Sequence, residues 1–143
     1  MTTPDPALLD LFAAVRNGVL ITIKRDGRPQ SSVVSHRFDA DARTLHVSLT
    51  EDRAKTRNLR RDPRASYHVS RPDMRGYVVG EAVAQLSPVA ADPHDDTVES
   101  LVAYYRAVAG EHPDWAEYRA AMVADRRLVL TLRFEHVYGG TGG

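Results

Sequence analysis

A dense run of basic side chains at residues 53–63 is the part of this sequence with the clearest chemistry. Five of its first nine residues are cationic, namely Arg53, Lys55, Arg57, Arg60 and Arg61. The run is rich in helix formers and closes with Asp62-Pro63, so it predicts a short helix. Arg53, Arg57 and Arg60 would share one face of that helix, where like charges repel one another. The pattern therefore favours an anionic ligand such as phosphate or carboxylate.

The start of the predicted helix would strengthen such a site. A helix N-terminus presents free N–H groups and a partial positive charge. Arg53, Lys55 and Thr56 lie where they would add charge and a hydroxyl, and Asn58 neighbours Lys55 on the helix surface. The alternative is a solvated basic turn whose arginines pair with nearby acids. Those acids are Glu51, Asp52 and Asp62.

The other residue types limit the kinds of catalytic or metal site that this chain can form. The chain has no cysteine, which excludes disulfides and thiolate sites, and no two of its six histidines have metal-ligand spacing, so no metal site is expected. No P-loop, dinucleotide-binding fingerprint or nucleophile elbow occurs. His36, on a predicted strand, is a candidate proton donor, with a structural role as the alternative. Tyr77, which follows the loop at 71–75, is a candidate for stacking on a planar ligand and a second candidate acid.

The amino-acid composition is typical of a globular protein. The 143 residues are 43% hydrophobic and 27% charged, and 19 basic residues balance 19 acidic ones. We expect a single domain over residues 1–143. A balanced charge gives no support to a nucleic-acid or membrane-surface partner. No stretch approaches the ~20 apolar residues of a membrane span, and no leader pattern is seen, so we expect a cytoplasmic protein.

Alternating apolar residues predict six strands, joined mainly by hairpins. They are expected at 19–24, 30–38, 44–49, 65–69, 76–86 and 128–134, with the Asp26-Gly27 turn between the first two. Gly80 predicts a bulge or a close approach by another group. A mainly β protein of this kind, with inserted helices, favours a closed or nearly closed antiparallel barrel, because closure removes exposed strand edges.

Three further helices are predicted. The first begins with Thr3-Pro4 and ends at Gly18. The other two begin with acidic capping pairs, Asp96 with Glu99 and Asp114 with Glu117.

Several segments together resemble one family. They are the hairpin at 23–30, the basic run at 53–65, Gly80-Glu81-Ala82 and the ending at 136–139. They are similar to the pyridoxamine 5'-phosphate-oxidase-like split-barrel proteins and, more narrowly, to the flavin/deazaflavin oxidoreductases that use coenzyme F420. The resemblance covers nearly the whole chain, and its most specific part is the Arg-x-Lys-Thr-x-Asn core of the basic run.

The resemblance implies a six-stranded antiparallel split β-barrel of the FMN-binding type. It also implies a homodimer with a cofactor in each of two clefts between subunits. Arg53 and Lys55 would hold the cofactor phosphate with Thr56 and Asn58 nearby, while Arg57 and Arg60 would suit the polyglutamate tail of coenzyme F420. The possible ring contacts are Ser32, Val34, Ser48 and Tyr77, the last from the other subunit.

The function implied is that of a coenzyme F420-dependent reductase, which transfers hydride from the reduced deazaflavin to a small unsaturated organic acceptor. One alternative is an FMN-dependent oxidoreductase like pyridoxamine-phosphate oxidase. We expect vitamin B6 oxidation to be disfavoured, because the C-terminal arginine segments that bind the pyridoxal product have no counterpart after Tyr138. Further alternatives are a non-catalytic F420-binding or carrier protein and an anion- or nucleic-acid-binding module.

Overall fold

One antiparallel sheet curls into a split barrel and carries the helices around it. The fold is seen in a computed structural model, which describes residues 5–142. The strands are β1 (Asn17–Ile23), β2 (Pro29–Ser35), β3 (Arg37–Asp39), β4 (Thr44–Thr50), β5 (Arg64–Ser70), β6 (Tyr77–Leu86) and β7 (Arg127–Gly140). The helices are α1 (Pro6–Ala14), α2 (Ala54–Arg61), α3 (Asp96–Ala109) and α4 (Trp115–Ala124). The sheet order is β2-β1-β5-β6-β7-β4-β3.

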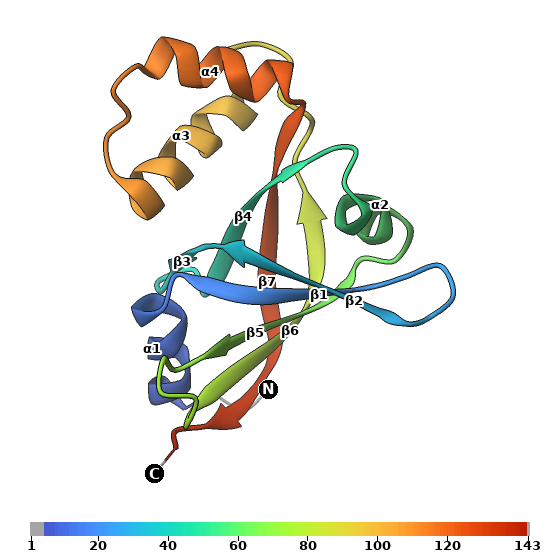
Figure 1. The fold of residues 1–143 in the computed structure, drawn as a ribbon, viewed down its shortest axis with the longest axis vertical. Coiled ribbons are helices and arrows are strands. Elements are labelled where there is room, and N and C mark those ends of the chain that lie inside the picture. Colours follow the sequence, from blue (N-terminus) through green and yellow to red (C-terminus); the bar gives the residue numbers. More distant parts are fainter. Residues whose placement is uncertain (1–4, 143) are drawn as a thin grey trace.

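The helices occupy distinct places around the barrel (Figure 1). Helix α1 lies at one end, the α3–α4 hairpin lies at the other, and α2 lies beside the barrel wall on the side where the β1–β2 hairpin projects. The predicted split barrel and the predicted basic helix are both confirmed.

The described residues form seven strands, where six were predicted. The expected strand at 30–38 is broken at His36 into β2 and β3. His36 is buried at 1% exposure, and its backbone N–H donates to the Arg16 carbonyl at 2.9 Å. The alternation of apolar and polar residues predicted one continuous strand, because that pattern does not reveal a single residue at which the strand breaks and the side chain is buried.

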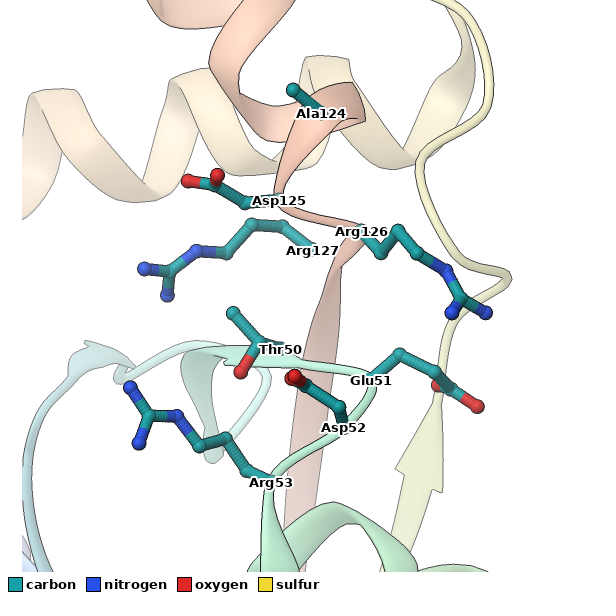
Figure 2. Close-up of a pocket in the computed structure, with 8 residues that line it drawn as sticks. All are labelled: Thr50, Glu51, Asp52, Arg53, Ala124, Asp125, Arg126 and Arg127. Carbon is teal, nitrogen blue, oxygen red and sulfur yellow. The ribbon is translucent and has the colours of Figure 1, made fainter.

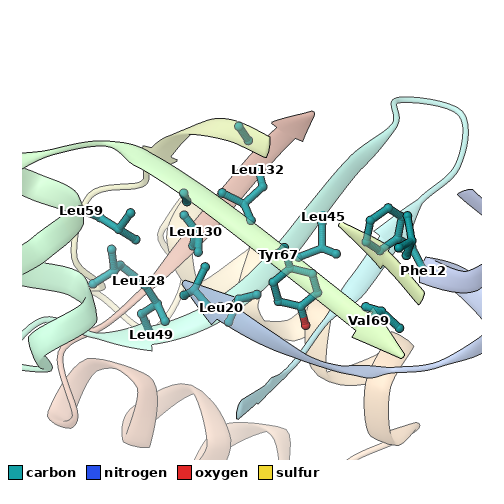
Figure 3. Close-up of a cluster of buried hydrophobic side chains, with 14 residues drawn as sticks. Phe12, Leu20, Leu45, Leu49, Leu59, Tyr67, Val69, Leu128, Leu130 and Leu132 are labelled. Carbon is teal, nitrogen blue, oxygen red and sulfur yellow. The ribbon is translucent and has the colours of Figure 1, made fainter. Parts of the chain in front are cut away.

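The barrel interior holds a continuous apolar core (Figure 3). Its largest members come from α1 and from strands β1, β4, β5 and β7, namely Phe12, Leu20, Leu45, Leu49, Tyr67, Leu128, Leu130 and Leu132. Leu59 is the one buried apolar residue of α2, at 2% exposure, and it packs into this core. Burial of one such side chain contributes about 1.5–3 kcal/mol, so Leu59 anchors α2 and leaves its basic residues outside.

Two glycines make room for aromatic rings of the core. A Cβ atom on Gly80 would lie 2.4 Å from the Phe134 ring, and the β6–β7 ladder shifts register between Glu81 and Ala82. The predicted close approach and bulge are therefore both present. The prediction that Gly18 ends the first helix is wrong: α1 ends at Ala14, and Gly18 lies in β1 against the Tyr67 ring.

The helix caps follow the predicted residue types with small shifts. The expected Thr3 cap lies outside the described residues, and Asp5 caps α1. Asp95, one residue before the predicted Asp96, caps α3, whereas Asp114 caps α4 as predicted. No helix in residues 5–142 is long and apolar enough to cross a membrane.

Candidate anion-binding site

Two polar side chains of α2 hold the helix against the barrel. Thr56 is fully buried, and its hydroxyl donates to the Thr50 carbonyl at 2.7 Å. Asn58 is buried at 8% exposure, and its amide donates to Thr22 Oγ1 and Gln30 Oε1, both at 3.1 Å. Both residues were predicted to lie near a phosphate. In the structure these polar groups position the helix that carries the cations.

Only part of the basic run is paired with acids. Arg60 forms an ion pair with Glu51, with Nε 3.1 Å from Oε1, as the alternative of a paired basic turn predicted. Asp62 pairs with Arg64, which lowers the pKa of the Asp62 carboxyl to about 2. Within residues 5–142 no ion pair involves Arg53, Lys55 or Arg57. The charges of these three side chains are therefore available to an anionic ligand.

Lys55 has other positively charged side chains close to it. Burial lowers the pKa of its ammonium, and the neighbouring Arg53 and Arg127 lower it further. Arg127 belongs to β7 and is brought here by strand pairing, because it lies opposite Thr50 in the β4–β7 ladder. The sequence reasoning did not find Arg127, since the only signal for it is the register between two strands far apart in the chain.

A pocket of about 580 Å³ opens beside this cluster, between the β4–α2 turn and the α4–β7 turn (Figure 2). Its lining residues are Thr50, Glu51, Asp52, Arg53, Ala124, Asp125, Arg126 and Arg127. The side chains of Arg127, above Thr50, and Arg53, below it, extend in the same direction, while Arg126 points the opposite way. The two turns are held together by the Glu51 N–H, which donates to the Arg126 carbonyl at 3.1 Å.

Two residues that line the pocket carry polar atoms without a partner in the described part of the protein. The Thr50 hydroxyl and the Arg127 Nε are buried, and neither has a hydrogen-bond partner within residues 5–142. No side chain caps α2, so the N–H groups of its first turn are also free to donate. The pocket lining holds three arginines and three acids. Glu51 is occupied by Arg60, Asp52 and Asp125 form no described ion pair, and Lys55 adds a further cation beside Arg53 and Arg127. Unused donors beside clustered cations fit an oxyanion such as phosphate.

Only some of the residues predicted to contact the cofactor ring lie near this pocket. Ser48 is adjacent, because its hydroxyl accepts a hydrogen bond from Arg127 at 3.3 Å. Ser32 and Val34 lie on the edge strand β2, opposite Leu20 and Gly18, and no described hydrogen bond joins them to the cation cluster. The structure therefore links Ser48, but not Ser32 or Val34, to the anion site.

Tyr77 lies away from the cation cluster. It begins β6, is 41% exposed and packs its ring 5.5 Å from that of His68. In the ladder with β5, Tyr77 pairs with Ser70, whereas the strand residue next to α2, Arg64, pairs with Val83. Tyr77 is thus at the other end of β6 from α2, and its contact with a cofactor of a second subunit stays a prediction.

His36 has no free ring nitrogen. Nε2 lies 2.7 Å from the Phe12 carbonyl oxygen, Nδ1 lies 2.6 Å from the Tyr67 hydroxyl, and burial lowers the pKa of the ring. This geometry fits the structural alternative and offers no route for a proton to a ligand on the surface. No group of three or more His, Asp or Glu side chains in the described part of the chain is arranged to hold a metal ion.

Comparison with known proteins identifies the family. The family model for pyridoxamine 5'-phosphate oxidase matches residues 4–139. This chain belongs to the pyridoxamine 5'-phosphate oxidase family. The match extends over β4, over the whole of α2 and over all of β7 except its last residue.

Solved structures share the same fold. A conserved hypothetical protein from Mycobacterium tuberculosis has a TM-score of 0.74 at 19% identity, over 98% of this chain and 86% of that one. A structure described as an F420 reductase has a TM-score of 0.67 at 22% identity, over 95% and 98%. A pyridoxamine 5'-phosphate oxidase-related, FMN-binding protein from Nostoc punctiforme has a TM-score of 0.65 at 17% identity, over 96% and 86%. These neighbours are all less than 25% identical to this chain, so they show a shared fold.

Proposed function

We propose that this protein is an oxidoreductase that uses coenzyme F420, reducing a small unsaturated organic acceptor with hydride from the reduced deazaflavin. The observation that carries the proposal is the crowding of Lys55 by Arg53 and Arg127, without a described acid partner for any of the three. Membership of the pyridoxamine 5'-phosphate oxidase family supports an oxidoreductase, and the similarity to an F420 reductase supports this cofactor.

The protein's own part is to bind and orient the cofactor. Arg53, Lys55 and Arg127 would neutralise its phosphate, and the Thr50 hydroxyl and the free N–H groups of α2 would donate to the remaining phosphate oxygens. Arg127 also donates to Ser48, so the phosphate site and a proposed ring contact would be set by one side chain. The bound cofactor would supply the hydride chemistry.

We further propose that the working form is a homodimer. Tyr77 lies at the end of β6 remote from α2, so it would reach a cofactor only across an interface with a second copy. The Tyr77 ring is 41% exposed, which leaves it available for such a contact.

The test is a fluorescence titration with coenzyme F420 and, separately, with FMN. We expect tighter binding of F420 that weakens with added salt. Lys55→Glu and Arg127→Gln should each weaken binding roughly 10- to 100-fold, because each removes a charge-assisted hydrogen bond. Arg133→Gln is the matched control, since Arg133 is exposed on β7 outside the pocket lining. Equal affinity in Lys55→Glu and the wild type would contradict the phosphate assignment.

A second candidate is an FMN-dependent oxidoreductase, which the similarity to the FMN-binding Nostoc punctiforme protein supports. A phosphate monoester would suit the same cations, so the two candidates differ in the rest of the cofactor. Tighter binding of FMN than of F420 in the same titration would favour this second candidate. Binding of F420 without reduction of any acceptor would instead favour a carrier protein.

A further inference from the structure

The barrel is split between β2 and β4, which do not pair with each other in the described sheet. Strand β2 lies at one edge of the sheet beside β1, and the β3–β4 ladder stops at Arg37, opposite His46. Two residues further on, the same register would place Ser35 opposite Ser48. The strand break at His36 prevents that pairing, so the backbone groups of both strands need other partners at this point.

Ser48 turns its backbone N–H and C=O toward this split. Its partner in the β4–β7 ladder is Val129. The Val129 N–H donates to Ser87 Oγ at 2.8 Å, and the Val129 carbonyl accepts from the Ser87 N–H at 3.0 Å. Both backbone groups of Val129 therefore face away from β4, and the pair of Ser48 with Val129 exchanges no backbone hydrogen bonds. In an antiparallel pair of that kind the N–H and C=O of each residue point away from the partner strand, which for Ser48 is toward the split.

A side chain of α3 joins the two strands across the split. The Tyr104 hydroxyl donates to the Ser35 carbonyl at 2.8 Å. Burial raises the pKa of this hydroxyl, and it does so against a hydrogen bond from the Ser48 backbone and the charge of Arg127, which both lower it. A phenol hydroxyl both donates and accepts. Tyr104 therefore satisfies one backbone group on each strand, where a continuous sheet would have a ladder bond.

Helix α3 is held in place over the split. It packs against β3, β4 and β7, and the side chain of Leu101 is fully buried. Near the end of the helix the Val108 carbonyl accepts from Arg16 Nη1 at 3.3 Å. The Arg16 carbonyl in turn accepts from the backbone N–H of His36 at the strand break. Tyr104 is thus fixed before any ligand arrives.

The bridge formed by Tyr104 lies between residues proposed to contact the two halves of the cofactor. On one side, the Ser48 hydroxyl accepts a hydrogen bond from Arg127, which lines the phosphate pocket. On the other side, Ser35 directly follows Val34, a predicted ring contact on β2. Tyr104 therefore connects the two strands that carry the predicted ring contacts.

We propose that Tyr104 is a positioning residue that sets the spacing of β2 and β4 at the cofactor ring, an inference that rests on the proposed function. Without its hydroxyl, the ring contacts on the two strands would lose their common geometry. The phosphate cations would keep theirs, because Arg53 is fixed at the start of α2 and Arg127 by the β4–β7 ladder. Loss of the hydroxyl should therefore weaken binding of the whole cofactor more than binding of a simple anion.

The test compares Tyr104→Phe with the wild type on two ligands, inorganic sulfate and whichever of F420 and FMN the wild type binds more tightly. Tyr104→Phe should weaken cofactor binding roughly tenfold and keep sulfate binding within about twofold of the wild type. Tyr105→Phe is the matched control, because Tyr105 is the next residue of α3 and its ring packs within the α3–α4 hairpin, on His112, Trp115 and Tyr118. Unchanged cofactor affinity in Tyr104→Phe, or an equal loss for both ligands, would overturn the inference.

A second measurement tests the bridge without any cofactor. Amide hydrogen exchange at Ser48 should be roughly tenfold faster in Tyr104→Phe than in the wild type, because the variant removes the acceptor of that N–H. Exchange at Leu49, whose N–H points toward β7, should stay the same. An unchanged rate at Ser48 would reject the bridge whatever the cofactor. A faster rate at Ser48 in a protein whose wild type binds neither cofactor would instead overturn the proposed function, and the role of Tyr104 at the ring with it.

Discussion

The Nδ1 atom of His36 lies 2.6 Å from the hydroxyl oxygen of Tyr67 inside the barrel. The other ring nitrogen, Nε2, lies 2.7 Å from the carbonyl oxygen of Phe12. A carbonyl oxygen only accepts, so Nε2 carries the proton and Nδ1 accepts from the Tyr67 hydroxyl. The arrangement therefore requires a neutral His36, and it joins α1 to β5 through the residue at which the predicted second strand breaks.

Stability should fall as the solution becomes mildly acidic. Burial lowers the pKa of His36 below its ordinary value of 6.5, so the unfolded chain takes up a proton at a higher pH than the folded one does. The contribution of neutral His36 is fully present above pH 6.5 and declines as the pH drops from there towards the depressed folded pKa. Urea unfolding between pH 7.5 and 5 measures this slope.

The variant His36→Gln should reduce that pH dependence. His46→Gln is the comparison, because burial lowers the pKa of His46 as well but its side chain is only half-buried. If His36→Gln unfolds with the same pH slope as the wild type, His36 is not the group responsible.

Tyr67→Phe should lower the free energy of unfolding by about 1–3 kcal/mol, because it leaves the buried Nδ1 atom of His36 without a donor. The ring itself stays, so the apolar packing changes little. Tyr138→Phe, at a tyrosine that is 44% exposed, should change stability by less than about 0.5 kcal/mol. Equal losses in the two variants, measured by urea unfolding, would mean that the His36–Tyr67 hydrogen bond contributes nothing.

Gly18→Ala should also destabilise the barrel. The new Cβ atom would lie 2.6 Å from the Tyr67 ring, which has no room to move within the core. Overpacking of this kind costs about 1–3 kcal/mol. Gly140→Ala is the matched strand control, because its Cβ would meet its nearest neighbour at an ordinary 3.9 Å. Thermal unfolding of both variants decides the matter, and an unshifted midpoint for Gly18→Ala would refute the steric argument.

The sequence predicted the barrel because each strand alternates between core and surface, as β4 does with Leu45, Val47 and Leu49 buried. It also predicted the basic helix, because the charge pattern is local. Arg127 was missed because its place beside Thr50 depends on the pairing of β4 with β7, which no local pattern specifies.

The roles of two α2 residues were less readable from the sequence. Thr56 was expected near the phosphate, but it lies three residues before Leu59 on the buried face of the helix. That spacing from the only large apolar residue of the run was the available signal. Asn58 gave no such signal, since its partners Thr22 and Gln30 come from strands 28 or more residues away.

Anion binding should depend on the protonation of Lys55. Burial and the charges of Arg53 and Arg127 lower the pKa of this ammonium in the free protein, and a bound anion would raise it again. Affinity should thus be full below the depressed pKa and fall as the pH rises through it, by up to about tenfold per pH unit. Sulfate is a suitable probe because its own charge does not change, and the stabilisation that it confers on the fold can be followed between pH 7 and 10. Lys55→Arg should flatten the profile, since a guanidinium stays charged throughout. A wild-type profile as flat as that of Lys55→Arg would show that Lys55 does not contact the anion.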